Sequence, residues 1–321
     1  MKNNEKGIWI STAIAASAVA AVAAVGYATT SLLVKTALDR EEPQIMKKSG
    51  INISGGGKNK FADLCADASS KLKGMPHETV KITAHDGVEL VGHYFPCEDA
   101  KRLIIAFHGW RSSWGSDYGV ISDFWHSNGC SVLYAEQRGQ NNSGGEYMGF
   151  GLVQRFDCVD WVRWAQGICG EIPLYLAGIS MGATTVLMAS DLDFPRAVNG
   201  IMADCGFTSP EAIWRHVARN NLHISYGIRS AVASAMCKQR INCGSGDYST
   251  LDALKKTKIP VLFVHGTDDH FVPVEMTYEN YKACASPKRL LIVPGADHAV
   301  SYCVNRDEYQ KAMLDFWADF D

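Results

Sequence analysis

The segment IPLYLAGISMGATTVLMAS, from Ile172 to Ser190, contains Ser180 with a glycine two positions before it and another two positions after it. The apolar run before Ser180 predicts a buried strand, and the small residues after it predict a helix packed close behind that strand. Gly178 and Gly182 remove side chains where strand and helix cross, so Ser180 can occupy a tight, strained turn that exposes its hydroxyl. The alternative is an ordinary turn that contains a serine. Because the chain has 29 glycines in 321 residues, the pattern Gly-x-Ser-x-Gly needs support from the rest of the sequence.

The overall composition is that of a globular protein, with 47% hydrophobic residues, 20% charged residues and a formal net charge of -3. The sequence has no concentrated basic run, so we expect no nucleic-acid partner. No group of His and Cys has the spacing of a zinc site, and we expect neither a metal nor a cofactor. The length allows one α/β domain of about 250 residues together with an N-terminal extension.

The N-terminal extension begins with an uncharged segment. Residues 8–34 contain no charged side chain, and as a helix they are long enough to cross a hydrocarbon core of roughly 30 Å. We therefore interpret residues 1–34 as a retained transmembrane anchor, with a cleaved signal peptide as the alternative. Lys2 and Lys6 favour a cytoplasmic N-terminus with the main domain outside, whereas Lys35 and other basic residues beyond the segment argue against this orientation.

Residues 35–74 have the composition of a linker. They contain Ser54-Gly55-Gly56-Gly57, which predicts a flexible tether, and a short helix is compatible with residues 61–71.

The ten cysteines of the chain show no framework spacing. Several lie in apolar runs, as buried thiols do. Only Cys237 and Cys243 are close enough in sequence to suggest a local disulfide, and the sequence leaves this pairing open.

Residues 75–321 are expected to form the main domain, in which strands alternate with helices. The predicted strands are residues 78–84, 89–95, 103–107, 131–135, 174–177, 198–203, 261–264 and 290–293, and the predicted helices include 156–166, 181–189 and 275–285. The first two strands read as an antiparallel hairpin. Continuous apolar strands separated by helices indicate an α/β fold, with a mostly parallel sheet covered on both faces.

Active groups of such sheets gather at the carboxyl ends of the strands. Four polar stretches follow predicted strands directly: Ser180, His108-Gly109-Trp110, Asp268-Asp269 and His298. Each alone has an ordinary explanation, since aspartates form turns and histidines occur in exposed loops. We interpret His108 as a structural histidine. The chain order serine, aspartate, histidine is the order of the catalytic groups in α/β-hydrolases, and the four signals together predict an active site.

From about residue 78 to its end, the chain resembles the α/β-hydrolase superfamily. The motifs FHGW, GISMG, DCGFTSP, HGTDDHFVP and PGADHAVSY resemble those of bacterial serine aminopeptidase-like and acyl-thioesterase-like serine hydrolases, many of which carry an N-terminal anchor. The stretch AEQRGQNNSGGEYMGFG resembles the Asp-x-Arg-Gly-His-Gly-x-Ser loop of that group. Here Glu136 stands where Asp is usual, and Gln140-Asn141 replace His-Gly.

The resemblance implies a role for each residue. Ser180 would be the nucleophile, His298 the base that takes its proton and later returns it to the leaving group, and Asp269 the acid that fixes the histidine tautomer. The tetrahedral oxyanion needs preorganised donors, which would be the backbone N–H groups of Met181 and Trp110. Water completes deacylation, so the mechanism itself requires no cofactor.

The choice of the acid rests on the family pattern His-Gly-x-x-Asp-x-x-Val-Pro. Counted from His265, this pattern places the acid at Asp269. Val272-Pro273 then fall at the Val-Pro positions of the pattern. Asp268 is then expected to be a loop residue, because neighbouring side chains point in different directions. Asp204, which follows an earlier strand, is the reserve candidate.

The substrate is the least determined property of the sequence. An insertion at about residues 207–258 lies where a helical lid is usual, and its aromatic and basic residues either touch substrate or pack on the domain. We expect a small-molecule, acyl or peptide substrate and favour cleavage of an ester-type acyl bond, because ester hydrolysis needs the fewest leaving-group contacts. The alternatives are an acyl thioesterase, a serine aminopeptidase-like peptidase, or a non-catalytic, membrane-tethered binding module.

Overall fold

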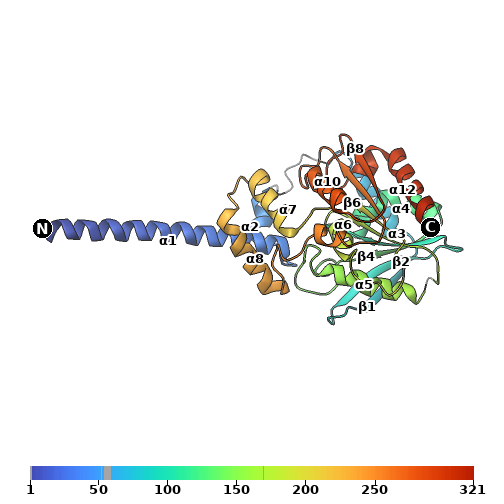
Figure 1. The fold of residues 1–321 in the computed structure, drawn as a ribbon, viewed down its shortest axis with the longest axis horizontal. Coiled ribbons are helices and arrows are strands. Elements are labelled where there is room, and N and C mark those ends of the chain that lie inside the picture. Colours follow the sequence, from blue (N-terminus) through green and yellow to red (C-terminus); the bar gives the residue numbers. More distant parts are fainter. Residues whose placement is uncertain (1, 52, 54–58, 169) are drawn as a thin grey trace.

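The structure is a computed structural model that describes residues 2–51, 53, 59–168 and 170–321, with the side chains of the first helix described at residue 17 and from residue 20 onward. Its centre is an eight-stranded sheet with strand order β1-β2-β4-β3-β5-β6-β7-β8. Helices cover both faces of this sheet, and one long helix projects from one end of the molecule (Figure 1).

The strands lie where the apolar runs predict them. They are β1 Glu78–Thr83, β2 Glu89–Phe95, β3 Arg102–Phe107, β4 Cys130–Ala135, β5 Leu174–Ile179, β6 Gly200–Asp204, β7 Val261–Gly266 and β8 Lys288–Val293. The pairs β1–β2 and β2–β4 are antiparallel, and the other neighbours are parallel. Every residue of β3, β4, β6 and β7 is buried, as expected for strands covered on both faces. The α/β prediction is confirmed.

The helices of the domain form two layers and an insertion. They are α3 Ala62–Gly74, α4 Trp114–Ser127, α5 Gln154–Gln166, α6 Met181–Ala189, α7 Pro210–His216, the π-helix η1 Val217–Asn221, α8 Gly227–Ile241, α9 Thr250–Leu254, α10 Val274–Ala283, α11 Ser301–Val304 and α12 Arg306–Phe320. Trp125 of α4 and Trp317 of α12 belong to the core on one face of the sheet. Trp161 of α5 and Leu187 of α6 belong to the core on the other face.

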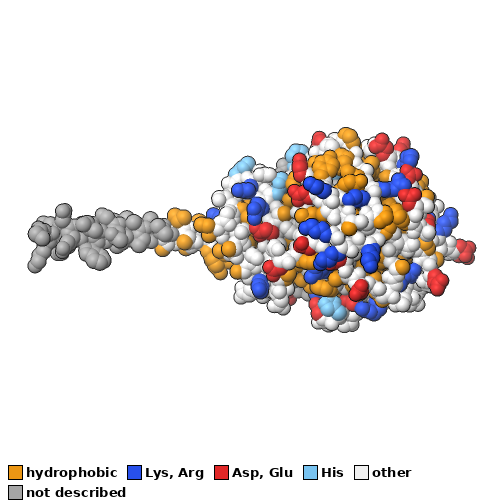
Figure 2. All heavy atoms as spheres, viewed as in Figure 1, with side chains coloured by type: hydrophobic (Ala, Val, Ile, Leu, Met, Phe, Trp, Pro, Cys, Tyr) orange, Lys and Arg blue, Asp and Glu red, His pale blue; other side chains and the backbone are white. Residues whose placement is uncertain are grey.

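The helix α1, Lys2–Leu38, combines an exposed part with a docked part. Val22, Val25 and Tyr27 are 74%, 66% and 61% exposed, whereas Val34 and Leu38 are buried in the domain. Figures 1 and 2 show the exposed part projecting from the end of the molecule that carries α7 and α8, with hydrophobic side chains around its base. The section Ala20–Leu38 is long and apolar enough to cross a membrane, a test that a signal sequence also passes.

The structure packs much of the expected linker against the domain. Asp39 pairs with Arg240 of α8 at 2.8 Å, and the Arg40 guanidinium donates to the carbonyl of Ser143 at 2.6 Å. A short helix, α2 Gln44–Ser49, follows, and α3 packs against α4. The glycine-rich stretch at residues 54–57 lies outside the described residues. These long-range contacts differ from the free tether that the composition predicts.

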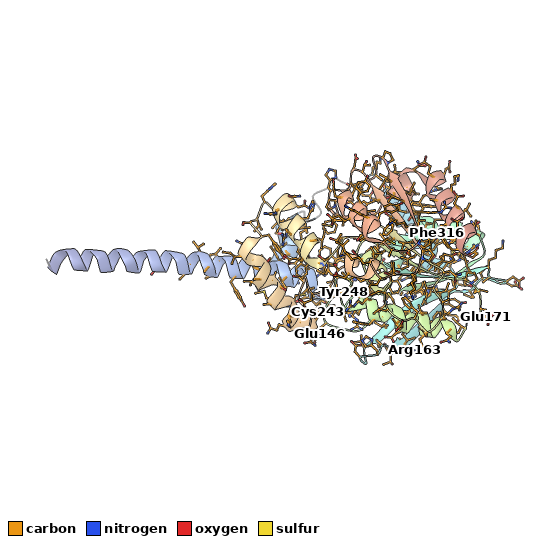
Figure 3. All side chains as sticks on the ribbon, viewed as in Figure 1. Glu146, Arg163, Glu171, Cys243, Tyr248 and Phe316 are labelled. Carbon is orange, nitrogen blue, oxygen red and sulfur yellow. The ribbon has the colours of Figure 1, made fainter. Side chains whose placement is uncertain are left out.

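The suggested local disulfide is absent from the described structure, in which Cys237 and Cys243 are free thiols. Cys237 is buried at the end of α8, and Cys243 (labelled in Figure 3) follows that helix.

The docking of α1 predicts where the chain tolerates truncation. Deletion of residues 1–28 is expected to leave thermal stability unchanged, whereas deletion of residues 1–38 removes two buried apolar side chains, Val34 and Leu38. Each contributes about 1.5–3 kcal/mol, so the melting temperature should fall by at least about 5 °C. Circular dichroism melts of both detergent-solubilised truncations check this. Equal melting temperatures would show that α1 does not stabilise the domain.

Candidate active site

Ser180 occupies a strained turn between β5 and α6. Its backbone has φ 56° and ψ −116°, in the left-handed range of φ that a non-glycine residue rarely adopts. A Cβ on Gly178 would overlap the backbone of Gly182 and Ala183, and a Cβ on Gly182 would overlap the backbone of Phe107. The two glycines are therefore required for the close crossing of β5 and α6, as the sequence predicts.

The loop after β8 brings His298 to Ser180. The hydroxyl of Ser180 donates to His298 Nε2 at 2.9 Å, and His298 Nδ1 donates to Asp269 Oδ2 at 2.7 Å. Because a carboxylate can only accept, Nδ1 carries a proton, and in the neutral imidazole Nε2 is therefore the acceptor of the Ser180 hydroxyl. The three predicted residues thus form one continuous chain of hydrogen bonds.

The carboxylate of Asp269 is buried and fully satisfied. Its side chain is 1% exposed. Oδ1 accepts from the N–H groups of Phe271 at 2.9 Å and Val272 at 2.8 Å, and Oδ2 accepts from His298 and from His265 Nε2 at 3.0 Å. Burial alone would raise the pKa of Asp269, but the positive charge of His298 and the histidine hydrogen bonds outweigh it and hold the pKa well below its usual range. The Asp269 carboxylate therefore stays ionised beside His298.

The interaction between Asp269 and His298, which lowers the pKa of Asp269, raises the pKa of His298. Burial favours the neutral imidazole, but the negative charge and hydrogen bond of Asp269 raise the pKa of His298 well above its ordinary value. An imidazolium formed during proton transfer is therefore stabilised by Asp269.

Two backbone N–H groups near Ser180, those of Met181 and Trp110, have no acceptor among the residues that the structure describes. Met181 is the first residue of α6, and the helical bonds begin at the Thr184 N–H, which donates to the Ser180 carbonyl. In the loop after β3, the N–H of Gly109 donates to Asp117 Oδ2 at 2.6 Å and that of Arg111 donates to Gln140 Oε1 at 2.5 Å.

Between these two bonded positions, the N–H of Trp110 has no acceptor among the described residues. Gly109 lies directly against Ser180, because a Cβ built on Gly109 would be 3.4 Å from the Ser180 Cβ. The structure therefore brings both predicted donors to the site, and their catalytic use remains a prediction.

The other candidates have different surroundings. Asp268 is exposed and accepts from the Thr267 hydroxyl at 2.7 Å. Asp204 is buried and accepts from the Tyr309 hydroxyl at 3.1 Å rather than from His298. His108 is buried, accepts from the Gln137 N–H at 3.2 Å and donates to the carbonyl of Gly109 at 2.8 Å, so it holds the loop after β3.

Sequence reasoning missed two supporting residues. His265 is buried, accepts from the Thr277 hydroxyl at 2.7 Å and donates to both Asp269 and the Val272 carbonyl. Gln140, at a position where the resemblance flagged a substitution, positions the Trp110 loop through its bond to Arg111. The motif HGTDDHFVP contained His265, but its spacing did not reveal the contact.

Two groups of described side chains have ligand atoms close enough together for a metal ion. Cys205, Asp269 and His298 form one, and His85, Asp157 and Asp160 form the other. Burial raises the pKa of the Cys205 thiol to about 12, so a metal ion at this group would have to displace the thiol proton.

The carboxylates of the second group serve ion pairs instead. Asp157 pairs with Arg138, and Asp160 pairs with Arg163 at 2.6 Å. The chemistry of neither group calls for a metal.

The fold defines this protein as an α/β-hydrolase. The chain belongs to the prolyl oligopeptidase family, whose sequence model matches residues 117–320, more than half of its length. It is 26% identical to the uncharacterized protein YqkD of Bacillus subtilis over 78% of this chain and 82% of that protein. It is 24% identical to the uncharacterized protein YfhR of Escherichia coli K12, over 74% of this chain and 80% of that protein.

Among solved structures, the chain is similar to the esterase Pf2001 of Pyrococcus furiosus. The TM-score is 0.63 at 20% identity, covering 83% of this chain and 96% of that chain. At this identity the likeness concerns the fold. Together with the family match it confirms the α/β-hydrolase resemblance and supports a hydrolase.

Replacing Asp269 by Asn is expected to lower kcat by about 10³–10⁴, because the imidazole loses its correct tautomer and its charge partner. It should also move the pH profile. His298 acts as base only when neutral, so wild-type kcat/KM falls as the pH drops through the raised pKa of His298. Without the Asp269 charge that pKa is lower, and the midpoint shifts to lower pH. Initial rates with p-nitrophenyl acetate across pH check both effects.

Asp268→Asn and Asp204→Asn are the controls. Asp268 is exposed, and its replacement should change kcat by less than about threefold. A larger loss at Asp268 or Asp204 than at Asp269, with all three variants folded, would show that the acid is assigned wrongly.

Proposed function

We propose that this α/β-hydrolase cleaves an ester-type acyl bond through an acyl-enzyme intermediate. The observation that carries the proposal is the hydrogen-bond chain from Ser180 Oγ to His298 Nε2, 2.9 Å, and from His298 Nδ1 to Asp269 Oδ2, 2.7 Å. This arrangement gives a serine hydroxyl, a weak nucleophile at neutral pH, the base it needs within hydrogen-bond reach.

In the proposed reaction, Ser180 Oγ attacks the substrate carbonyl carbon while His298 Nε2 takes the hydroxyl proton. The N–H groups of Met181 and Trp110 hold the developing oxyanion, and each such donor contributes about 3–4 kcal/mol to transition-state stabilisation. His298 then gives its proton to the departing alkoxide. Water attacks the acyl-serine with the same histidine as base, which releases the acid and restores Ser180.

The described lining of the apolar cavity beside the site favours an acyl over an aminopeptidase substrate. Binding a free amino terminus calls for a carboxylate, and the described lining residues include Arg229 as their one charged side chain, with no Asp or Glu. A thioester follows the same acyl-enzyme route and is the second candidate. A non-catalytic binding module would not need the complete hydrogen-bond chain.

The location of the protein relative to a membrane is also part of the proposal. We propose that α1 is retained and anchors the protein in a membrane, with the catalytic domain on the outer side, following the positive charge of Lys2 and Lys6. The exposed apolar side chains of α1 between residues 20 and 27 support burial of this part in lipid.

Ser180→Ala is expected to lower kcat for p-nitrophenyl butyrate by at least about 10⁴-fold, since the nucleophile is removed. Labelling by a fluorophosphonate probe should be lost with it. The matched control is Ser190→Ala, which removes the hydroxyl of a buried serine at the other end of α6 that has no hydrogen-bond partner among the described residues. Wild-type activity in Ser180→Ala would end the proposal.

A further inference from the structure

An apolar cavity lies where three parts of the chain meet. One wall is the docked end of α1, including Leu33 and Val34, and a second is the insertion of α7, η1 and α8, including Ala233. The third wall consists of Trp110 and Phe271, which belong to the loops of the candidate active site. The walls are almost wholly apolar, as expected of a site for a hydrocarbon group.

The active-site wall joins the cavity to the reacting groups. The backbone N–H of Trp110 has no acceptor in the described part of the chain, and the ring of Phe271 meets the ring of His298 edge-on at 5.1 Å. The rings of Trp110 and Phe271 are 6.3 Å apart, centre to centre. An acyl chain whose carbonyl lies at Ser180 would pass these two rings on its way into the cavity.

The α1 wall joins the cavity to the exposed apolar section of the same helix. Tyr27 and Val25 are exposed, and Thr30, Leu33, Val34 and Ala37 line the cavity. From Val25 to Leu33 the helix rises only about 12 Å. Two further exposed apolar residues belong to neighbouring helices, Ile45 of α2 at 64% and Ile228 of α8 at 91% exposure. If lipid surrounds the exposed part of α1, the cavity lies at the membrane surface.

Hydrogen bonds join the end of α1 to the loop after β3, which contains Trp110. They hold the α1 wall of the cavity in place beside this loop. The indole of Trp110 donates to the carbonyl of Ala37 at 2.9 Å, and the guanidinium of Arg111 donates to the carbonyls of Thr36 and Asp39 at 2.9 and 2.8 Å. The helix end thus has its free carbonyls capped by the loop that would hold the oxyanion.

Two buried donors in the cavity wall indicate what else an occupant carries. Trp214 Nε1 and Arg229 Nη1 have no acceptor among the described residues. A buried donor without a partner costs free energy, which an occupant with acceptor oxygens would relieve.

We propose that the substrate is a long-chain acyl ester of a glycerolipid, taken directly from the bilayer that holds α1. The inference rests on the proposed hydrolase function and specifies its substrate class. Ser180 Oγ forms the new acyl bond as the bond to the glycerol oxygen breaks, and that oxygen leaves with the proton from His298. Water then releases a fatty acid and restores the serine.

The test uses the full-length protein in vesicles of ether-linked phosphatidylcholine, which has no acyl ester, containing either 1-palmitoyl glycerol or 1-butyryl glycerol. We expect kcat/KM for the palmitoyl ester to exceed that for the butyryl ester by at least about tenfold, because more apolar surface is buried. Hydrolysis should fall at least about tenfold when the palmitoyl ester is placed in separate vesicles. Equal rates for the two esters would overturn the chain-length inference, and equal rates from separate vesicles would overturn entry from the bilayer.

These failures are distinguishable from failure of the hydrolase function. Hydrolysis of p-nitrophenyl butyrate without hydrolysis of either glycerol ester would reject the lipid substrate alone. If that ester is also untouched and the fluorophosphonate probe does not react, the hydrolase function itself is wrong.

Variants that fill the cavity with a larger side chain test directly whether the acyl chain occupies it. Ala233→Trp is expected to lower the palmitoyl-to-butyryl ratio of kcat/KM at least about tenfold, and Val217→Trp, on η1, should do the same if the first variant does not fold. Ala235→Trp makes the same change at an exposed position of α8 outside the cavity lining and should leave the ratio unchanged. An unchanged ratio in both cavity variants would show that the chain does not occupy this cavity.

Discussion

The backbone crossing of β5 and α6 is the constraint on which the site depends. Two glycines let the helix approach the strand and leave Ser180 at a φ of 56°, a conformation of order 1–3 kcal/mol in strain. The surrounding packing maintains it, because α6 is buried along its whole length and the Ser180 N–H donates to the Asp204 carbonyl at 2.8 Å. The same turn directs the hydroxyl to His298 and leaves the Met181 N–H free.

The electrostatics of the site follow from burying one carboxylate among fixed donors. Asp269 has two backbone N–H groups and two imidazoles around it, so its charge is stabilised without water and is available to His298. The loop after β3 is fixed in a comparable way, by Gln140 on one side and by the end of α1 on the other. The docked end of α1 thereby helps to hold the loop beside Ser180 in place.

Local patterns in the sequence were sufficient to predict the strands of the sheet and the residues of the hydrogen-bonded triad. Apolar runs located the eight strands, and residues directly after strands supplied Ser180 and His298. The helix α4 was not identified, because its two glycines and its Ser and Asp residues have poor helix propensity, and it forms through the burial of Trp114, Tyr118 and Trp125. The contacts of Asp39 and Arg40 were also missed, since their partners lie more than 100 residues away.

Trapping the acyl-enzyme would show whether Ser180 is the nucleophile. Rapid acid quenching during turnover of p-nitrophenyl butyrate, followed by tryptic digestion and mass spectrometry, should find a butyryl group on the peptide of residues 164–196, which contains Ser180. Cys205, the other nucleophile near His298, lies in the separate peptide of residues 197–215. A butyryl group on that second peptide, or turnover with neither peptide modified, would contradict the account of Ser180 as the nucleophile.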